Sequence, residues 1–518
     1  MSTNTQKDTT LDFEKLIQDW QNLPPGHVVT TAELAELLLA AETAITAASY
    51  LWAEMIQVLI AHGGLKKEQA AKELVRACRV KADLGMMPHD VWTFIPAFLG
   101  SRGYDMNYSG AFTLHGKAGM HDRDYIGKQM KIWNVEVGLC PAQAIDWGLD
   151  NWMVDQQEKL RREVAQKLRF DPAIDPDQTE LKRFVCMMIP AQATPQQSEK
   201  VWKAAEIAFA TFIYRAKNHV RYVWKNSAHL MPILFGTQGD GKSEAIKTLC
   251  EPLRQAGMFA SVGFDAFDDN DQSYQLSLMP VWLFEEMQGI SKADISKLKA
   301  IMTDSERQMR AAYGRTGVKQ IITTFIACTN EDTAEKIRDS SGNRRFIQFE
   351  TQPVDRALIH SIDAEKIWRS VDEDAAEPPM YATPENAALI KEIQLRQRYL
   401  SPVEHWLMDC PNIPWGTSLK ATGWWEGHGA CLSADDYGFH DWLKAHYGAN
   451  EVNQWSAVKL GYALKDLSKR YDIEVVPYGG SNKYAIMKPK GLVEDDAAGG
   501  DSGVVDLSEG RTRYRKVS

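Results

Sequence analysis

The sequence has few cysteines, and their spacing does not suggest a shared role. The seven are Cys78, Cys140, Cys186, Cys250, Cys328, Cys410 and Cys431. They are odd in number, far apart and never in CxxC spacing, which excludes a disulfide framework and a cysteine-ligated zinc site. This pattern is typical of reduced thiols and predicts a cytoplasmic location.

We expect neither a membrane span nor an export signal. The most apolar stretch, around residues 37–60, is interrupted by Glu42 and Glu54. It therefore falls short of the ~20 apolar residues that a bilayer span needs. The opening residues MSTNTQKDTT lack the basic and apolar regions of a secretory signal. We expect no membrane partner.

Positive charge is not in excess, because the formal net charge is -10 at pH 7. This excludes a general positive coat but not a nucleic-acid partner, for which a local basic channel is sufficient. The stretch VEDDAAGGDSGVVDLSEG at 493–510 is acidic and glycine-rich, and the basic RTRYRKVS follows it. Residues 491–518 thus predict a disordered acidic tail with a basic end. A solvated tail is favoured over a docking peptide.

A chain of 518 residues that is 44% hydrophobic can form several domains. From Met231 to about Glu350, apolar strand candidates alternate with helical ones, the pattern of a parallel sheet covered by helices. The fold class expected is multi-domain α/β. The domains expected are a helical region of unknown role at 1–110, an α+β and helical domain at 111–215, an α/β core at 216–371, a linker with a helix at 372–410, and a winged-helix-like α+β domain at 411–490.

The stretch GTQGDGKS, Gly236–Ser243, matches the phosphate-loop pattern GxxxxGK[ST]. Its glycines let backbone N–H groups turn toward a polyphosphate, Lys242 brings a positive charge, and Ser243 offers a hydroxyl to Mg²⁺. A strand-like MPILF precedes it and a helix-like SEAIKTLC follows. The motif predicts ATP and Mg²⁺ as cofactors. The expected nucleotide-binding residues are Gly236, Gly239, Asp240, Gly241, Lys242, Ser243 and Glu244.

A second motif supplies carboxylates, since VWLFEE is an apolar strand candidate that ends in Glu285 and Glu286. One carboxylate near the hydrated Mg²⁺ and another that orients the attacking water would suit ATP hydrolysis. We place Glu285 with Ser243 at the metal. Which of the two glutamates is the base stays open.

A third motif decides the class: QIITTFIACTN is a strand candidate ending in Asn330, and GNRRF follows at 342–346. In this order of motifs the chain resembles the superfamily 3 helicases of small viruses, phages and plasmids. It is most similar to their virulence-associated protein E-like and phage or satellite primase-helicase branch. The stretches that carry this likeness are EEMQGISKADISKLKAIMT, RAAYGR and CTNEDTAEKIRDSSGNRRF.

The resemblance implies an AAA+-like ATPase core that assembles into a ring, usually a hexamer. Asn330 would be the sensor that polarises the attacking water or touches the γ-phosphate. Arg344 or Arg345 would be the arginine finger that reaches the nucleotide of a neighbouring subunit. With Lys242, Glu285 and Glu286, these residues complete the catalytic set.

DNA contacts are expected in MRAAYGRTGVKQ, where GRTG suits a hairpin turn flanked by Arg315 and Lys319. In the family that the chain resembles, a hairpin at this place moves DNA. Lys299 and Arg310 also match the branch pattern, but whether they face DNA, nucleotide or a neighbouring subunit stays open. The alternative is that these charges are only solvated.

The leading hypothesis is an ATP-dependent DNA helicase that unwinds DNA in replication of a phage or mobile element. It would act in the host cell cytoplasm on single-stranded and forked DNA. Other replication proteins could bind its C-terminal tail. No primase module is expected, because DRDY at 122–125 and FDAFDDNDQ at 264–272 are the only close carboxylate clusters and neither has a supporting histidine. The alternatives are an origin-binding initiator that ATP only switches, and a P-loop motor for packaging or defence.

Overall fold

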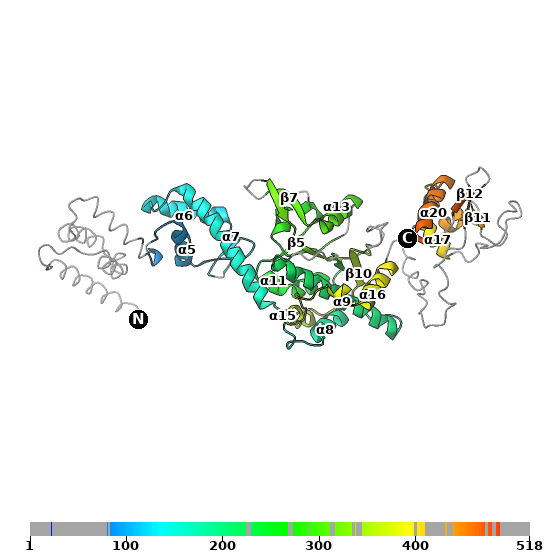
Figure 1. Cartoon of the computed structure of the whole chain (residues 1–518), viewed down its shortest axis with the longest axis horizontal. Coiled ribbons are helices and arrows are strands. Elements are labelled where there is room, and N and C mark those ends of the chain that lie inside the picture. The colour runs from blue at the N-terminus through cyan, green and yellow to red at the C-terminus, as the bar shows by residue number, and fades with distance from the viewer. Residues whose placement is uncertain are drawn as a thin grey trace. The chain divides into compact units, whose positions relative to one another are not determined.

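The computed structural model describes residues 83–86, 88–115, 117–223, 229–267, 273–287, 290–310, 316–333, 344–397, 401–409, 430–432, 439–471, 475–478 and 483–486, with Asn22, Val80 and Ile337. The chain divides into two compact units, one of residues 1–288, 297–330 and 349–382 and the other of residues 289–296, 331–348 and 383–518. Figure 1 labels their elements. Most of the region at 1–110, Arg315 and the tail at 491–518 lie outside the described residues.

Three helices and a small antiparallel sheet form the first described part of the first unit. They are α5 (Val91–Arg102), β1 (Tyr104–Met106), β2 (Phe112–Leu114), β3 (Lys117–His121), α6 (Arg123–Val137) and α7 (Ala142–Lys167). Phe94, Ile95 and Leu149 lie in their shared core. The domain boundary expected at 110/111 falls between β1 and β2, which pair with each other.

A five-stranded sheet in the order β10-β4-β9-β6-β5 is the centre of the α/β region. Its strands are β4 (Met231–Phe235), β5 (Phe259–Val262), β6 (Val281–Phe284), β9 (Thr324–Thr329) and β10 (Phe346–Glu350). The pairs β4/β9, β9/β6 and β6/β5 are parallel. All residues of β6 and β9 are buried, as in a sheet covered on both faces. The expected α/β class is confirmed.

Helices connect and cover these strands. They are α8 (Thr179–Met188), α9 (Pro195–Val220), α10 (Lys242–Leu249), α11 (Glu251–Gln255), α13 (Lys292–Thr303), α14 (Arg356–His360) and α15 (Ala364–Arg369), with short 3-10 turns at Phe264–Phe267, Gln275–Ser277 and Pro379–Tyr381. The long helix α9 contacts β4 and β9, so the boundary expected at 215/216 falls inside a helix that packs on the five-stranded sheet. No helix within the described ranges has the length and apolar content to span a bilayer.

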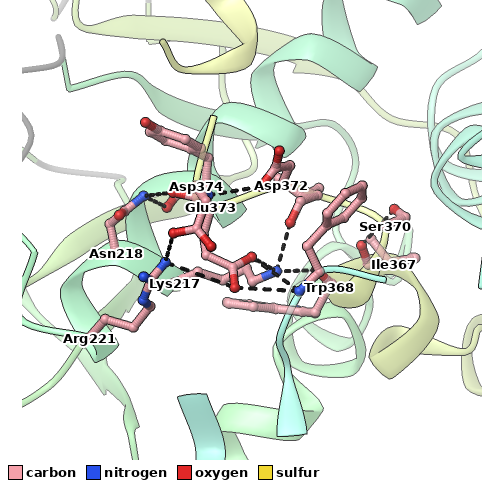
Figure 2. Close-up of polar contacts among 12 residues, drawn as sticks. Lys217, Asn218, Arg221, Ile367, Trp368, Ser370, Asp372, Glu373 and Asp374 are labelled. Atoms are coloured by element: carbon pink, nitrogen blue, oxygen red, sulfur yellow. Dashed lines mark hydrogen bonds and ion pairs between the residues drawn. The ribbon is translucent and has the colours of Figure 1, made fainter. Parts of the chain in front are cut away.

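A buried ion pair joins the end of α9 to the segment after α15. The Lys217 ammonium lies 2.6 Å from a Glu373 carboxylate oxygen, and the two side chains are 4% and 2% exposed. Lys217 also donates to the backbone carbonyls of Trp368 and Val371, at 3.0 and 2.7 Å (Figure 2). Burial lowers the pKa of Lys217 below its usual value, and Glu373 partly offsets this. The pair fixes α15 against α9.

The segment after this ion pair, expected from its composition to be part of a linker, packs on α9 as well. Tyr214 donates its hydroxyl to the carbonyl of Ala375 at 2.9 Å. The backbone N–H of Met380 donates to the Thr211 hydroxyl at 3.0 Å. Residues up to Ala382 accordingly belong to the first unit.

The second unit continues with helices and a three-stranded antiparallel sheet in the order β11-β13-β12. Its elements are α16 (Pro384–Arg396), α17 (Pro402–Asp409), β11 (Ala430–Leu432), α18 (Phe439–Tyr447), α19 (Ala449–Val452), α20 (Ala457–Tyr471), β12 (Val475–Tyr478) and β13 (Lys483–Ile486). Tyr478 pairs with Lys483, so β12 and β13 form the hairpin that the sequence predicts around GGSN.

Replacing Lys217 with methionine leaves the Glu373 carboxylate buried without its charge partner. We expect the Lys217→Met variant to lose about 3–5 kcal/mol of unfolding free energy, measured by urea denaturation. The double variant Lys217→Met/Glu373→Leu should recover most of this loss, because it removes both buried charges. Arg221→Gln is the matched control, since Arg221 is 32% exposed and its guanidinium lies 4.0 Å from Glu373. Equal losses in Lys217→Met and in this control would contradict a buried clamp.

Candidate nucleotide and nucleic-acid sites

The phosphate loop runs from the end of β4 to the first residue of α10. Gly239 and Gly241 adopt φ values of 97° and 84°, in the left-handed region where L-residues are strained. A Cβ atom on Gly241 would lie 2.7 Å from Ile359 Cδ1, whereas one on Gly239 would meet no atom within 4 Å. The loop thus packs on α14 at Gly241 and is open at Gly239, which leaves backbone there accessible to a phosphate.

Lys242 is the first residue of α10 and is buried. Its ammonium donates to the carbonyl oxygens of Gly236 at 2.9 Å and Thr237 at 2.6 Å. The positive charge therefore lies across the loop, at the N-terminus of a helix whose free N–H groups also attract anions. Glu244, one residue past Ser243, pairs with His360 of α14 at 3.2 Å.

The register of the parallel strands brings the phosphate loop, the two glutamates and Asn330 to the same edge of the sheet, where the carboxyl ends of the strands lie. Phe235 of β4 pairs with Thr329 of β9, and Phe284 of β6 pairs with Ala327. The carboxyl ends of all three strands therefore lie side by side. Asn330 follows β9, between the phosphate loop and the two glutamates. Asn330 is exposed, and its side chain has no hydrogen-bond partner among the described residues.

A cysteine connects the phosphate loop to the acidic strand. The Cys328 thiol lies 3.1 Å from the Ser243 hydroxyl and 3.2 Å from the backbone carbonyl of Glu285, to which it donates. Burial raises the pKa of this thiol, so it stays protonated and remains a donor. Cys328 was missed in the sequence, where nothing distinguishes it from the other six cysteines.

The two glutamates have different surroundings. Glu285 lies 2.8 Å from the Lys247 ammonium and accepts a hydrogen bond from the Ser261 hydroxyl. Burial alone would raise the pKa of Glu285, but the bonds from Lys247 and Ser261 and the Lys247 charge hold it below its usual value. Glu286 is exposed, and no part of the chain that the structure describes pairs with its carboxylate. Glu285 is thus a fixed anion, and Glu286 is free to contact water.

The sheet edge at the carboxyl ends of β4, β9 and β6 fits a nucleoside triphosphate with Mg²⁺. Gly239 leaves room beside the loop, Lys242 supplies a charge for the phosphates, and Ser243 and Glu285 supply the oxygen ligands that Mg²⁺ prefers. Lys247 and Ser261 hold Glu285 in place. Neither was named from the sequence, although Lys247 follows Ser243 by four residues and so shares its helix face.

The two arginines of the expected catalytic set lie before the edge strand. Arg344 and Arg345 form the turn that leads into β10. They belong to the second unit. Arg344 is exposed and Arg345 is partly buried.

The β-hairpin that was expected to contact DNA is present, and it consists of β7 (Glu306–Arg310) and β8 (Thr316–Gln320). The turn was expected at GRTG, but Thr316 and Gly317 of that stretch already lie in β8, and residues 311–315 lie outside the described residues. Arg307 pairs directly with Lys319, and both are exposed. Neither has an acidic partner within the described ranges. Like charges that face each other across strands repel, so this pair presents uncompensated positive charge.

The remaining candidates are less informative. Lys299 is half-buried on α13, and its carbonyl accepts a hydrogen bond from Thr303 at 2.7 Å. Arg310 ends β7, and its side chain lies outside the described residues. In DRDY, Asp122 caps α6 and Arg123 pairs with Asp146 and Asp150, so this carboxylate cluster is structural.

A comparison with known protein families finds a similarity in the part of the chain that holds these residues. Residues 223–399 match the virulence-associated protein E-like domain family. This region is similar to that family. It holds the phosphate loop, both glutamates, Asn330 and the hairpin, and it supports the superfamily 3 helicase-like, primase-helicase relationship expected from the motifs. No curated protein matches the chain.

Two solved structures that resemble the chain are distant. The apo C-terminal region of NrS-1, residues 305–718, is 12% identical over 59% of this chain and 78% of that chain, with a TM-score of 0.32. JCV helicase with a bound small molecule is 12% identical over 55% of this chain and 84% of that chain, with a TM-score of 0.24.

Removing the Lys242 ammonium takes away the charge at the phosphate loop. We expect Lys242→Ala to weaken binding of a fluorescent ATP analogue by about tenfold or more, the size of a lost charged hydrogen bond. Lys182→Ala, an exposed lysine of α8, is the control and should bind normally. AMP should compete poorly and ADP well, since the loop is expected to hold the β-phosphate. Competition by AMP as strong as that by ADP would argue against phosphate recognition.

Proposed function

We propose that the virulence-associated protein E-like domain hydrolyses ATP and uses the energy to move along DNA and separate its strands during replication of a phage or mobile element. The observation that carries this is the meeting of three polar strand ends at one sheet edge, with β9 between the phosphate-loop strand and the acidic strand. Such an edge places charge, metal ligands and a water-orienting pair around one phosphate.

Each side chain of the edge then has a defined task. Lys242 neutralises the β- and γ-phosphates, and Ser243 with Glu285 holds Mg²⁺, which withdraws charge from the phosphate oxygens. Glu286 is the base that takes a proton from the attacking water, since its carboxylate is exposed and unpaired within the described residues. The Asn330 amide orients that water. Cys328 keeps the Ser243 hydroxyl in register with the acidic strand.

Assembly and DNA contact complete the proposal. Arg344 or Arg345 acts as a finger on the nucleotide of a neighbouring subunit, which requires a homo-oligomer, and a hexameric ring is the proposed form. The β7/β8 hairpin grips the phosphate backbone through Arg307 and Lys319, together with Arg315 from the connection. Lys299 and Arg310 are further candidates for DNA or subunit contacts. A cytoplasmic location fits this role.

The two glutamates are separable by experiment. We expect Glu286→Gln to bind ATP normally but to lose hydrolysis about 10²- to 10⁴-fold, the size of a lost general base. Glu285→Gln should instead raise the Mg²⁺ concentration needed for binding a fluorescent ATP analogue. ATP hydrolysis and unwinding of a forked duplex are measured together, with and without single-stranded DNA. Hydrolysis that DNA does not stimulate, with no strand separation, would favour an ATP-switched initiator.

Substitution of the hairpin cations Arg307 and Lys319 tests whether the β7/β8 hairpin binds DNA. Arg307→Gln and Lys319→Gln should each weaken binding of single-stranded DNA and lower the slope of log K against log salt by about 0.7 for each phosphate that is no longer neutralised. Thermal stability should not fall, because the change relieves repulsion between directly opposed cations. Arg254→Gln, which removes a cation already paired with Glu251 at 2.7 Å, should leave the slope unchanged. If the two hairpin variants had the same salt slope as the Arg254→Gln control, the hairpin would not be a DNA-binding element.

A further inference from the structure

The C-terminal part of the second unit has the element order of a helix-turn-helix with a wing. After α17 and β11 come α18, a connection that includes α19, then α20 and the hairpin β12/β13, and the sheet order is β11-β13-β12. The connection is packed, since the Trp455 ring lies 5.6 Å from that of Phe439 on α18. The His440 ring also contacts the Trp455 carbonyl at 3.0 Å. These contacts fix where α20 begins relative to α18.

Helix α20 has two distinct faces. Leu460, Leu464 and Leu467 are 0%, 0% and 4% exposed and form its inner face. On the other side Val458 is 47% and Tyr462 is 71% exposed, one turn apart in the N-terminal half of the helix. Lys465 is exposed one further turn along. An apolar residue and an aromatic one thus stand in solvent where a second helix-turn-helix element presents its reading side chains.

The charge of α20 complements a polyanion. Its sequence contains Lys459, Lys465, Lys469 and Arg470 against the single acid Asp466, in a chain whose net charge is -10. Lys459 donates to the Gln454 carbonyl at 2.9 Å and lies 4.4 Å from the centre of the Trp455 ring. Lys459 therefore braces the turn, and Lys465 is an exposed cation further along the described part of α20.

We propose that α20 binds in the major groove of duplex DNA, with Val458 and Tyr462 against base edges and Lys465 on the phosphate backbone. A major groove about 12 Å wide accepts one α-helix, and an exposed valine suits the thymine methyl group. The proposal is independent of the nucleotide site. It gives the chain a site for unopened duplex in addition to the single-strand path proposed for the hairpin.

The test uses the full chain carrying Lys242→Ala, without nucleotide, so that ATP binding and hydrolysis do not contribute to the measured DNA binding. Anisotropy of a labelled duplex and of its single strand is followed against salt, and duplexes bound from a randomised pool are sequenced. We expect Tyr462→Ala to weaken duplex binding about tenfold and to relax the sequence preference. Lys465→Gln should lower the duplex salt slope by about 0.9. Lys391→Gln, an exposed lysine of α16, should change neither.

Three results would overturn the proposal: duplex affinity unchanged in both α20 variants, equal loss in Lys391→Gln, or binding of the single strand alone. Because Tyr462 is so exposed, Tyr462→Ala should keep the circular dichroism and melting temperature of its parent. ATP hydrolysis measured with Lys242 intact should also be unchanged in Tyr462→Ala. A failure here would thus leave the proposed motor untouched, and a failed motor would leave duplex binding by α20 standing.

Discussion

The candidate site depends on the parallel register of β4, β9 and β6. All six residues of β9 are buried, so alternation of polar and apolar residues does not set the position of this strand. Its start is fixed by hydroxyl groups instead. Thr323 donates to the carbonyls of Leu276 and Met279 at 3.0 and 2.8 Å, and Thr324 lies 3.1 Å from His219. A slip by one residue would break these contacts and turn the side chain of Cys328 to the opposite face.

The parts of the site that sequence predicts are those whose geometry is local. A phosphate loop is set by its own glycines and lysine, and a polar residue after a buried strand must lie at the sheet edge. The roles of Cys328 and Ser261 were not predictable in this way, because each contact crosses to another strand or helix. The Cys328 contacts depend on β9 lying between β4 and β6, and the Ser261 contact depends on β5 pairing with β6. Arg307 was missed for a similar reason, since its pairing with Lys319 follows only from the register of β7 against β8.

The extent of the first compact unit was also hard to infer from composition. Acidic and proline-rich residues near 372–386 read as a linker, yet Glu373 is among the most buried carboxylates of the described chain. Its partner Lys217 lies on a helix that looks amphipathic in sequence. This ion pair and the contacts of Tyr214 and Thr211 with the same segment join residues that are distant in sequence, and only three-dimensional packing reveals such pairings.

The indole N–H of Trp368 donates to the carbonyl of Leu249 at 2.7 Å, at the last residue of α10. The Trp368 carbonyl in turn accepts from Lys217 on α9. The helix that begins at the phosphate loop is thus coupled at its far end to α9, a rod of 26 residues and so about 39 Å long. Helix α10 is therefore anchored at both ends, by Lys242 at the loop and by Trp368 at Leu249.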